Sequence, residues 1–310
     1  MKKAVITGAT GAVGRALIGA LGASCTEVLV LARPGSARNA CLPRASHVRV
    51  LEVDLTALSD VDTTAMPSAP FDVFFHLGWM GTYGAARADE ALQARNVQAA
   101  LGAAALAERL GCRHFVGVGS QAEYGNVPLG VPITEALKPA PVTAYGCAKL
   151  EAMQQTRAAC AARGIRHVWA RLFSVYGEGD RPDSFIMQLL TALQKGTPFA
   201  MTAGEQQWDY LHAADAARAL LLLAEYGRDG AVYNVAAGKS RPLRAFAECA
   251  RDLLSPQTPL AVGALPYPAG QAMNLSADIS VLMRDTGFVP EVDFAHGVAA
   301  LADFLQHGGQ

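Results

Sequence analysis

Short apolar runs alternate with longer segments of helical periodicity through the first half of the chain. The pattern predicts strands at residues 3–7, 27–32, 48–53, 71–77, 114–118 and 166–172, with helices at 15–21, 92–110 and 144–163 among the segments between them. Strands joined through helices require crossover connections, and these build a parallel sheet with helices on both faces. The pattern therefore predicts an α/β fold with a Rossmann-like, doubly wound parallel sheet.

The rhythm changes after Phe173, where loops lengthen and proline becomes more frequent. A smaller C-terminal substrate-binding lobe is predicted here, interleaved with a return to the first domain. We expect residues 1–171 and about 209–237 to form the dinucleotide-binding domain. Residues of about 172–208 and 238–310 are expected to form the lobe.

Composition narrows the classes of function. The chain has 310 residues, of which 51% are hydrophobic and 17% charged, and its net charge is −1. This balance is typical of a globular core, and it gives no overall field to attract nucleic acid or an anionic membrane. No uncharged apolar stretch reaches the ~18 residues that span a bilayer. Six cysteines without paired or zinc-ligand spacing predict reduced thiols, a cytoplasmic protein and no metal.

A glycine-rich segment follows the first predicted strand. Residues 7–14 read TGATGAVG and open a helix. Gly8 permits a tight turn, Gly11 allows a pyrophosphate to approach the backbone, and Gly14 allows the helix to pack closely on the strand. Such turns also serve as plain connectors, but the strand–turn–helix setting predicts a dinucleotide site.

The end of the second strand bears on which dinucleotide binds. An acidic residue there would accept hydrogen bonds from the ribose of NAD, whereas a basic one would pair with the 2′-phosphate of NADP. The chain has Arg33 at this point and Arg38 shortly after, with no acid. NADP is therefore favoured, with NAD as the alternative if Arg33 is only a solvated loop residue.

Three side chains suggest acid–base chemistry. Tyr145 and Lys149 lie four residues apart on the third predicted helix, hence on one face of it. An ammonium near a phenol is expected to lower the tyrosine pKa from its usual ~10, which suits proton transfer near neutral pH. Ser120 follows the fifth strand, at the carboxyl edge where ligands of parallel sheets bind.

Taken together, these residues resemble the extended short-chain dehydrogenase/reductases of the NDP-sugar epimerase/dehydratase superfamily over nearly the whole chain. The matching motifs are the glycine-rich fingerprint, Asp54-Leu55, His76-Leu77-Gly78, Asn96, S-Q-A-E-Y-G at 120–125, the Tyr145–Lys149 pair, R-L-F-S-V-Y-G at 171–177, and D-Y-L-H at 209–212 with Asp215.

The resemblance implies roles for these residues. Tyr145 would donate a proton to a ketone oxygen, Lys149 would hold the nicotinamide ribose, and Ser120 would hydrogen-bond the reacting oxygen. It also implies a homodimer in which helices 92–110 and 144–163 form a four-helix bundle with their mates. The implied cofactor contacts are Gly8, Thr10, Gly11, Ala12, Val13, Gly14, Arg33, Arg38, Asp54, Leu55, Leu77, Gly78, Asn96, Val118, Tyr145, Lys149, Leu172, Phe173 and Val175.

Departures from the family pattern narrow the reaction. The 4,6-dehydratases of the family carry an Asp-Glu pair after the catalytic Ser or Thr, where this chain has Gln121 and Ala122. Trp208 stands where an arginine usually binds the nucleotide phosphate. His76 is interpreted as a packed structural residue. Trp79, Met80 and Tyr83 either line a sugar site or cap the sheet. The substrate contacts predicted are Trp79, Gln121, Arg181 and Trp208.

The tracts around Trp79 and Ser120 are closer to bacterial NDP-4-keto-6-deoxyhexose reductases. We therefore expect an NADPH-dependent reductase acting on the C4 ketone of a nucleotide-linked deoxysugar. An NAD-dependent NDP-sugar 4-epimerase would use the same three residues. A non-catalytic NADP-binding regulator is the alternative outside enzymes, although such a protein has no need of an intact Ser120, Tyr145 and Lys149 set.

Overall fold

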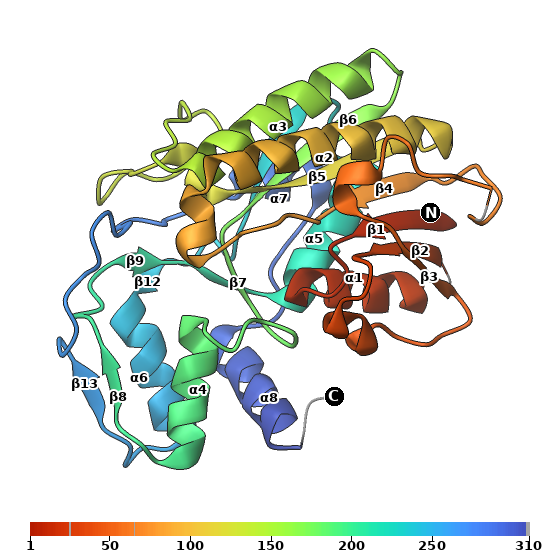
Figure 1. Ribbon diagram of the computed structural model, residues 1–310. Helices are drawn as coiled ribbons and strands as arrows, with labels where there is room; N and C mark the ends of the chain where they lie inside the picture. Colours follow the sequence, from red (N-terminus) through yellow and green to blue (C-terminus); the bar gives the residue numbers. More distant parts are fainter. Residues whose placement is uncertain (25, 65, 308–310) are drawn as a thin grey trace.

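A seven-stranded parallel sheet forms the centre of the molecule (Figure 1). The computed structural model describes residues 1–24, 26–64 and 66–307. Its sheet has the strand order β11-β6-β5-β4-β1-β2-β3, and every neighbouring pair is parallel. The strands are β1 (Lys3–Thr7), β2 (Glu27–Ala32), β3 (Val48–Glu52), β4 (Val73–His76), β5 (His114–Ser120), β6 (Arg166–Leu172) and β11 (Ala231–Val235).

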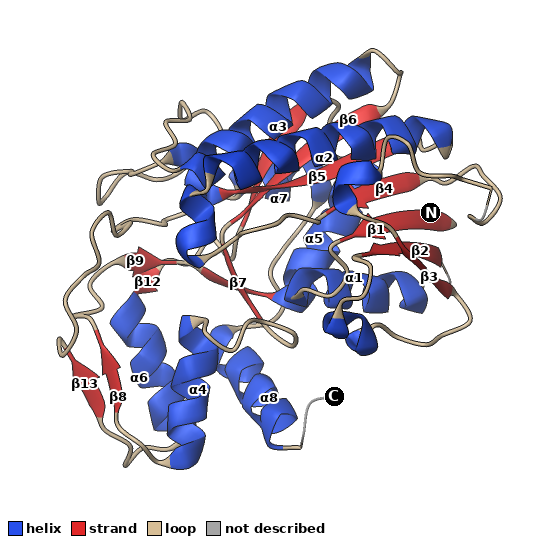
Figure 2. Ribbon diagram, viewed as in Figure 1, coloured by secondary structure: helices blue, strands red, loops and turns tan. Residues whose placement is uncertain are grey.

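Helices cover both faces of this sheet, as Figure 2 shows. On one face lie α2 (Glu90–Arg109) and α3 (Ala144–Ala161), which pack side by side. On the other lie α1 (Ala12–Ala23) and α5 (Ala213–Tyr226). Successive side chains of β1 pack on opposite faces of the sheet. Ile6 packs with α1 and α5, and Val5 packs with α2. The predicted doubly wound α/β fold is confirmed.

Cover on both faces explains why the inner strands of the sheet read as continuous apolar runs, whereas the edge strand β3 is largely exposed. A strand that is covered on both faces has no solvent-facing side chains to break the run. The predicted strands match within a few residues. β4 begins at Val73 rather than 71, and β5 extends to Ser120 instead of stopping at Val118. The extension pairs Ser120 with Leu172 of β6 in the sheet register.

After β6 the chain leaves the sheet and later returns to it. It runs through β7 (Ser174–Tyr176) into α4 (Phe185–Lys195), and then through β8 (Phe199–Met201), β9 (Gln207–Trp208) and β10 (Tyr210–His212). It re-enters the main body at α5 and β11. The remaining elements are β12 (Arg241–Pro242), α6 (Leu243–Leu254), β13 (Leu260–Val262), α7 (Ser280–Thr286) and α8 (Phe294–Gln306).

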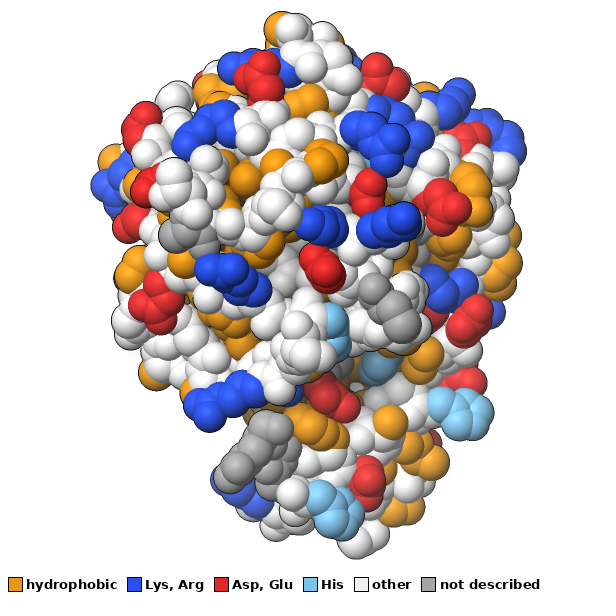
Figure 3. Space-filling view, turned by 90° about the vertical axis from the view of Figure 1, so that its right-hand side faces the viewer, with side chains coloured by type: hydrophobic (Ala, Val, Ile, Leu, Met, Phe, Trp, Pro, Cys, Tyr) orange, Lys and Arg blue, Asp and Glu red, His pale blue; other side chains and the backbone are white. Residues whose placement is uncertain are grey.

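Helices α4, α6 and α8 with strands β8 and β13 form a second, smaller group, which we term the C-terminal lobe (Figure 1). Its separate apolar core includes Leu189, Phe246 and Leu301. Helix α7 packs instead against β11 of the main sheet. In Figure 3 the molecule narrows toward its smaller lower part, and acidic and basic side chains are interspersed over that face.

The strand order reverses between β1 and β4. From β1 the chain adds β2 and β3 on one side, whereas β4, β5, β6 and β11 extend the sheet on the other. Crossover loops diverge at such a point, and ligands of open parallel sheets bind outside it. Within the described part of the chain no helix is long and apolar enough to cross a membrane. Cys41, Cys112, Cys147, Cys160 and Cys249 are free thiols there, while Cys25 lies outside it.

Candidate active site

The glycine-rich turn joins β1 to α1 at the switch point. Gly8 has φ +74°, and a Cβ on it would lie 2.6 Å from the backbone nitrogen of Gly78. Gly14 is equally confined, since its Cβ would meet the Gly8 carbonyl and the Ala9 backbone. Gly11 is different, because it has φ −82° and its Cβ would be 3.7 Å from the nearest atom. Gly8 and Gly14 are therefore required by the fold, whereas Gly11 leaves an open approach to the N-terminus of α1.

A cleft of about 400 Å³ opens beside this turn, over the ends of β1, β2 and β3. Arg38 of the short helix η1 (Ala37–Cys41) donates a hydrogen bond to the carbonyl of Thr10 at 2.9 Å and so ties the η1 segment to the turn. The cleft contains predicted cofactor residues from all three strand ends. Those lining it are Gly8, Thr10, Arg33, Arg38, Asp54, Leu55 and Gly78, together with the substrate candidate Trp79.

Asp54 is the acidic residue that lines this cleft, and its carboxylate is already engaged. It accepts hydrogen bonds from the backbone nitrogen of Thr56 at 2.8 Å and from the Thr56 hydroxyl at 2.7 Å. These bonds hold the pKa of Asp54 below its usual range. The second strand ends in Ala32-Arg33, so a guanidinium stands at the position where an acid would select NAD.

Asn96, which is predicted to contact the cofactor, bonds to the loop after β4. Its side chain is fully buried in α2. Its amide nitrogen donates to the Met80 carbonyl and its amide oxygen accepts from the Met80 nitrogen, both at 2.8 Å. Both polar atoms are thus used on the loop after β4, so Asn96 holds that loop, and its contact with a cofactor stays a prediction.

Other predicted cofactor residues lie outside this cleft. Val13 packs partly buried against the core under the sheet, and Ala12 lines a different cavity. On the far side of β4, Val118 lies in β5 beside the carboxyl end of β6. Leu172, Phe173 and Val175 continue from that end, with Leu77 after β4 also packed against this core.

The three predicted catalytic residues meet at the carboxyl end of β5. Ser120 ends that strand and caps the short helix η4 (Gln121–Tyr124), where its hydroxyl accepts from the Ala122 nitrogen at 3.2 Å. Tyr145 and Lys149 occupy the first two turns of α3, whose N-terminus is capped by the Thr143 hydroxyl. Their exposed fractions are 8% for Ser120, 7% for Tyr145 and 3% for Lys149.

Lys149 is held by contacts on several sides. Its Nζ donates to the Val118 carbonyl at 2.7 Å and lies 3.7 Å from the centre of the Trp79 ring. The centre of the Tyr145 ring is farther away, at 5.9 Å. Burial lowers the pKa of Lys149 to about 7, an effect that the negative charge of Glu123 opposes.

The expected depression of the Tyr145 pKa is wrong for this structure. Burial raises the pKa of Tyr145. A hydrogen bond with Ser120 and the positive charge of Arg87 act in the opposite direction, and Lys149 does not contribute. The reason is geometric, because the Lys149 ammonium faces Val118 and Trp79 rather than the phenol. A protonated Tyr145 remains suited to donating a proton.

The loop after β4 covers the three predicted catalytic residues, and the sequence pattern does not show what fixes this loop. Trp79 meets Tyr145 edge to face at 6.3 Å, and the Arg87 guanidinium lies 4.4 Å from the centre of the Tyr145 ring. Buried Gln93 accepts from Trp79 Nε1 at 2.8 Å and donates to the carbonyls of Gly81 and Ala86. Gln93 precedes Asn96 by one helical turn, and this spacing is the signal that could have revealed it.

The remaining substrate candidates lie on three separate segments of the chain. Gln121 is half-buried beside Ser120 in η4. Arg181 follows β7 and places its guanidinium 4.1 Å from the centre of the Tyr83 ring, so the two loops meet there. Trp208 packs between the main core and the lobe core, and its indole nitrogen is buried without a hydrogen-bond partner. His76 is buried, bonded to Thr7 at 3.0 Å, and has its pKa lowered to about 3 by burial.

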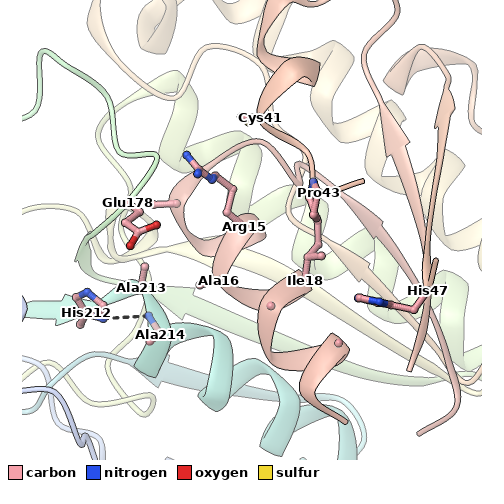
Figure 4. Close-up of a pocket in the computed structure, with 13 residues that line it drawn as sticks. Arg15, Ala16, Ile18, Cys41, Pro43, His47, Glu178, His212, Ala213 and Ala214 are labelled. Carbon is pink, nitrogen blue, oxygen red and sulfur yellow. Dashed lines mark hydrogen bonds between the residues drawn. The ribbon is translucent and has the colours of Figure 1, made fainter. Parts of the chain in front are cut away.

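A larger cavity of about 500 Å³ lies away from this chemistry, on the outer side of α1 (Figure 4). Small side chains of α1 form much of its wall, with Arg15, Glu178 and His212 at one end. It contains none of the three catalytic candidates. Within the described residues no cluster of three or more His, Cys, Asp or Glu could hold a metal ion.

Comparisons with known proteins identify a family and several similar structures. The family described as "NAD dependent epimerase/dehydratase family" matches residues 4–236. GDP-6-deoxy-D-mannose reductase of Pseudomonas aeruginosa is 28% identical, over 96% of this chain and 94% of that protein. A UDP-N-acetylglucosamine 4-epimerase from Methanobrevibacter ruminantium has a TM-score of 0.88 at 23% identity, covering 99% of this chain and 98% of that one. RMD from Pseudomonas aeruginosa, solved with NADPH, has a TM-score of 0.77 at 24% identity, covering 97% and 99%.

Proposed function

This chain belongs to the NAD dependent epimerase/dehydratase family, a family of NAD(P)-dependent enzymes, and on that premise we propose that it is an NADPH-dependent reductase. Its proposed substrate is the C4 ketone of a nucleotide-linked 4-keto-6-deoxyhexose. The similarity to a GDP-6-deoxy-D-mannose reductase over nearly the full length of both chains supports this class of substrate.

One observation carries the choice of net reduction, namely the basic character of the adenosine cleft. Arg33 and Arg38 both line it, and its acidic residue Asp54 is bonded to Thr56. A guanidinium pairs with a 2′-phosphate through a fork of charge-assisted hydrogen bonds. A cofactor that is consumed and exchanged in each turnover suits a reductase, whereas an epimerase returns the hydride and keeps its NAD.

The residues around the cleft fit a dinucleotide. Glycines at positions 8 and 14 bring strand, turn and helix so close that a Cβ has no room, and Gly11 leaves the N–H groups at the start of α1 approachable. Backbone N–H groups and the helix dipole favour an anion there. When bound, a reduced nicotinamide supplies the hydride for the reaction.

The protein's part in the reaction is proton transfer and orientation. Tyr145 is held protonated by its burial and would donate its phenolic proton to the ketone oxygen as that oxygen gains negative charge. The Ser120 hydroxyl would hydrogen-bond the same oxygen, which stabilises its developing charge. Lys149, buried between Val118 and Trp79, would present its ammonium to the nicotinamide ribose.

Dehydration is disfavoured by the side chains beside Ser120. Removal of water from the sugar needs an acid and a base next to the reacting carbons. Gln121 and Ala122 carry neither group, and the next acid, Glu123, is fully buried and already bonded to other residues. Ser120, Tyr145 and Lys149 would therefore support hydride and proton transfer, but the groups needed for elimination of water are absent beside them.

The test is to identify the cofactor and then to measure turnover. The purified protein is denatured, its released dinucleotide is identified, and NADPH oxidation is followed with GDP- and dTDP-linked 4-keto-6-deoxyhexoses. We expect loss of NADPH in step with formation of a 6-deoxyhexose. Release of tightly held NAD, together with interconversion of UDP-hexoses and no net NADPH oxidation, would establish the 4-epimerase instead.

We further propose the two-part organisation and the homodimer expected from the resemblance. The C-terminal lobe would bind the nucleotide sugar over the carboxyl edge of the sheet. Helices α2 and α3 lie together on one outer face, with Ala94 and Ala158 among their exposed side chains, which favours close packing against a second copy. Light scattering is the measurement; a monomeric mass at micromolar concentration would contradict the dimer.

A further inference from the structure

Glu123 is a fully buried carboxylate directly behind the proposed catalytic centre. It lies in η4, three residues after Ser120, and its exposed fraction is 0%. A carboxylate without partners is costly to bury by several kcal/mol, so such a residue is retained only where hydrogen bonds and an opposite charge compensate. Its partners therefore indicate what it does.

The Glu123 carboxylate closes the turn that carries Ser120. Its Oε1 accepts from the backbone nitrogen of Ser120 at 2.9 Å and from Trp169 Nε1 at 3.0 Å. Its Oε2 accepts from Nε of buried Arg171 at 2.6 Å. The Ser120 hydroxyl in turn accepts from the Ala122 nitrogen, so side chain and backbone of Ser120 are fixed together.

The fit around this carboxylate is tight. Gly119 lies against both Glu123 and the Trp169 ring, and a Cβ on Gly119 would collide with both. Arg171 also lies 4.4 Å from the centre of the Tyr124 ring, which adds a stacking contact to the ion pair. The carboxylate is thus held in one place relative to Ser120 by β5, β6 and η4.

Charge links Glu123 to the other two catalytic candidates as well. Its negative charge acts on Lys149 of α3 and raises the pKa of that ammonium against the larger, opposite effect of burial. It also adds to the raised pKa of Tyr145, where Arg87 from the loop after β4 opposes it. His76 of β4 faces Lys149 too, but its pKa of about 3 leaves it uncharged near neutral pH.

We propose that Glu123 is a positioning residue for the proposed reduction: its carboxylate fixes Ser120 through the backbone nitrogen of that residue, and its negative charge acts on Lys149 and Tyr145. It does not touch the reacting atoms, because all its hydrogen bonds go to protein groups. Arg171 compensates its charge through the ion pair. The catalytic significance of this inference rests on the proposed function, whereas the titration that tests it needs no substrate.

Asp215 offers a matched control. It is also a buried acid, 1% exposed, and it is paired with Arg218 at 2.8 Å. It accepts from the backbone nitrogens of Glu291 and Val292, so it fixes a turn much as Glu123 does. It is not among the groups that shift the pKa of Lys149 or Tyr145. A purely structural role of Glu123 would make the two residues behave alike.

The experiment follows Lys149 by nuclear magnetic resonance in protein labelled with 13C at the lysine ε-carbon, with Lys149→Arg to assign its signal. In the wild type we expect a titration midpoint near pH 7. Glu123→Gln keeps the shape and removes the charge, and we expect it to lower the midpoint by about one pH unit. Asp215→Asn should leave it unchanged.

Activity gives the second readout. In Glu123→Gln the loss of turnover at alkaline pH should begin about one pH unit lower, with the KM for NADPH changed less than about threefold. An unchanged Lys149 midpoint in a folded Glu123→Gln variant would overturn the proposal, as would an equal shift in Asp215→Asn. A wild-type midpoint below about pH 6 would overturn it without any variant.

Two features keep the test decisive. Glu123→Gln leaves Arg171 buried without its partner, so Glu123→Gln/Arg171→Met serves if the single variant does not fold; replacing both members of a buried pair is often tolerated. The double variant should lower the Lys149 midpoint in the same way. The titration needs no substrate, so inactivity toward 4-keto sugars would remove the proposed function while leaving this result readable.

Discussion

The proposed dinucleotide site has two halves, which differ in how they are built. The adenosine half, over β1, β2 and β3, is an open cleft whose charged groups, Arg33 and Arg38, reach solvent. In the catalytic half, over β5 and α3, Ser120, Tyr145 and Lys149 are each at most 8% exposed. We expect the first half to select its ligand through charge and backbone shape. The second sets the protonation of its side chains through burial, so its chemistry depends on the surrounding packing.

The substitution Tyr145→Phe should separate the functions of the two halves most clearly, because it affects turnover and not cofactor affinity. Because only the proton donor is removed, we expect turnover to fall by about a thousandfold, within the usual range for a general acid. The affinity for NADPH should change less than about threefold, since the phenol lies away from the adenosine half. Single-turnover kinetics and a fluorescence titration measure the two. Retention of most of the rate would mean that Ser120 or a water is the acid.

Within the adenosine half, the glycines should divide into ligand and fold residues. Gly11 has room for a Cβ, so Gly11→Val should keep the fold and lower NADPH affinity by at least about tenfold by blocking the pyrophosphate. Gly14→Ala places a Cβ against the Gly8 carbonyl and should lower the free energy of unfolding by about 1–3 kcal/mol.

Titration calorimetry and urea denaturation measure the two glycine variants. Unchanged NADPH binding in Gly11→Val would place the dinucleotide elsewhere and contradict the description of both halves.

Arg33→Ala tests the charge of the open half. We expect the wild type to prefer NADPH over NADH by about tenfold or more and the variant to lose most of that preference, since a charge-assisted contact contributes about 1.5–3 kcal/mol. Arg44→Ala is the control, because Arg44 is exposed in the same segment but does not line the cleft. Comparing kcat/KM for the two cofactors gives the answer, and an equal loss in both variants would argue against a specific phosphate contact.

The halves should also differ in pH dependence. Lys149 has its pKa lowered to about 7, and its charged form is the one expected to act, so turnover should be highest below that pH. For one titrating group with this midpoint, the charged fraction falls about fivefold between pH 7 and 8. The preference for NADPH should stay flat over the same interval, since arginines remain charged. A pH-independent turnover would exclude Lys149 as the titrating group.

The smallest effect is expected where the loop after β4 meets the segment after β7. Arg181→Met removes the cation from the Tyr83 ring, a contact of about 0.5–1 kcal/mol at an exposed site. The KM for the sugar substrate should rise about two- to fourfold with kcat unchanged. Lys195→Met, in α4 of the lobe and exposed, is the control. A fall in kcat would instead give Arg181 a part in the catalytic half.

The sequence predicted the backbone-determined parts of this molecule well. Runs of apolar residues predicted six of the strands of the main sheet, and the spacing of glycines predicted the turn at Gly8. Strands and tight turns both depend on local geometry, so a local pattern can indicate them. Short strands of two or three residues, such as β9, carry too little pattern to be seen. The Ser120, Tyr145 and Lys149 cluster followed from the position of strand ends and a helical repeat, although its catalytic role stays a prediction.

What the sequence could not supply is side-chain direction. Asn96 lies at a motif position, yet it faces the Met80 backbone, and only the packed loop shows this. The pKa of Tyr145 depends on burial and on where the Lys149 ammonium faces. Glu123 is part of the S-Q-A-E-Y-G motif, but nothing in a linear pattern indicates that its carboxylate bonds to the Ser120 nitrogen and to Arg171.

The late return of the chain to β11 has a consequence for synthesis. During translation the first six strands of the main sheet emerge before the strand that covers the edge of β6, and the excursion through residues 173–230 separates them. Until residues 231–235 leave the ribosome, β6 presents unpaired backbone groups of an apolar strand, a surface prone to pairing with other chains. A nascent or prematurely terminated chain ending before β11 is therefore expected to aggregate or to require a chaperone, even though every proposed catalytic residue has already been made.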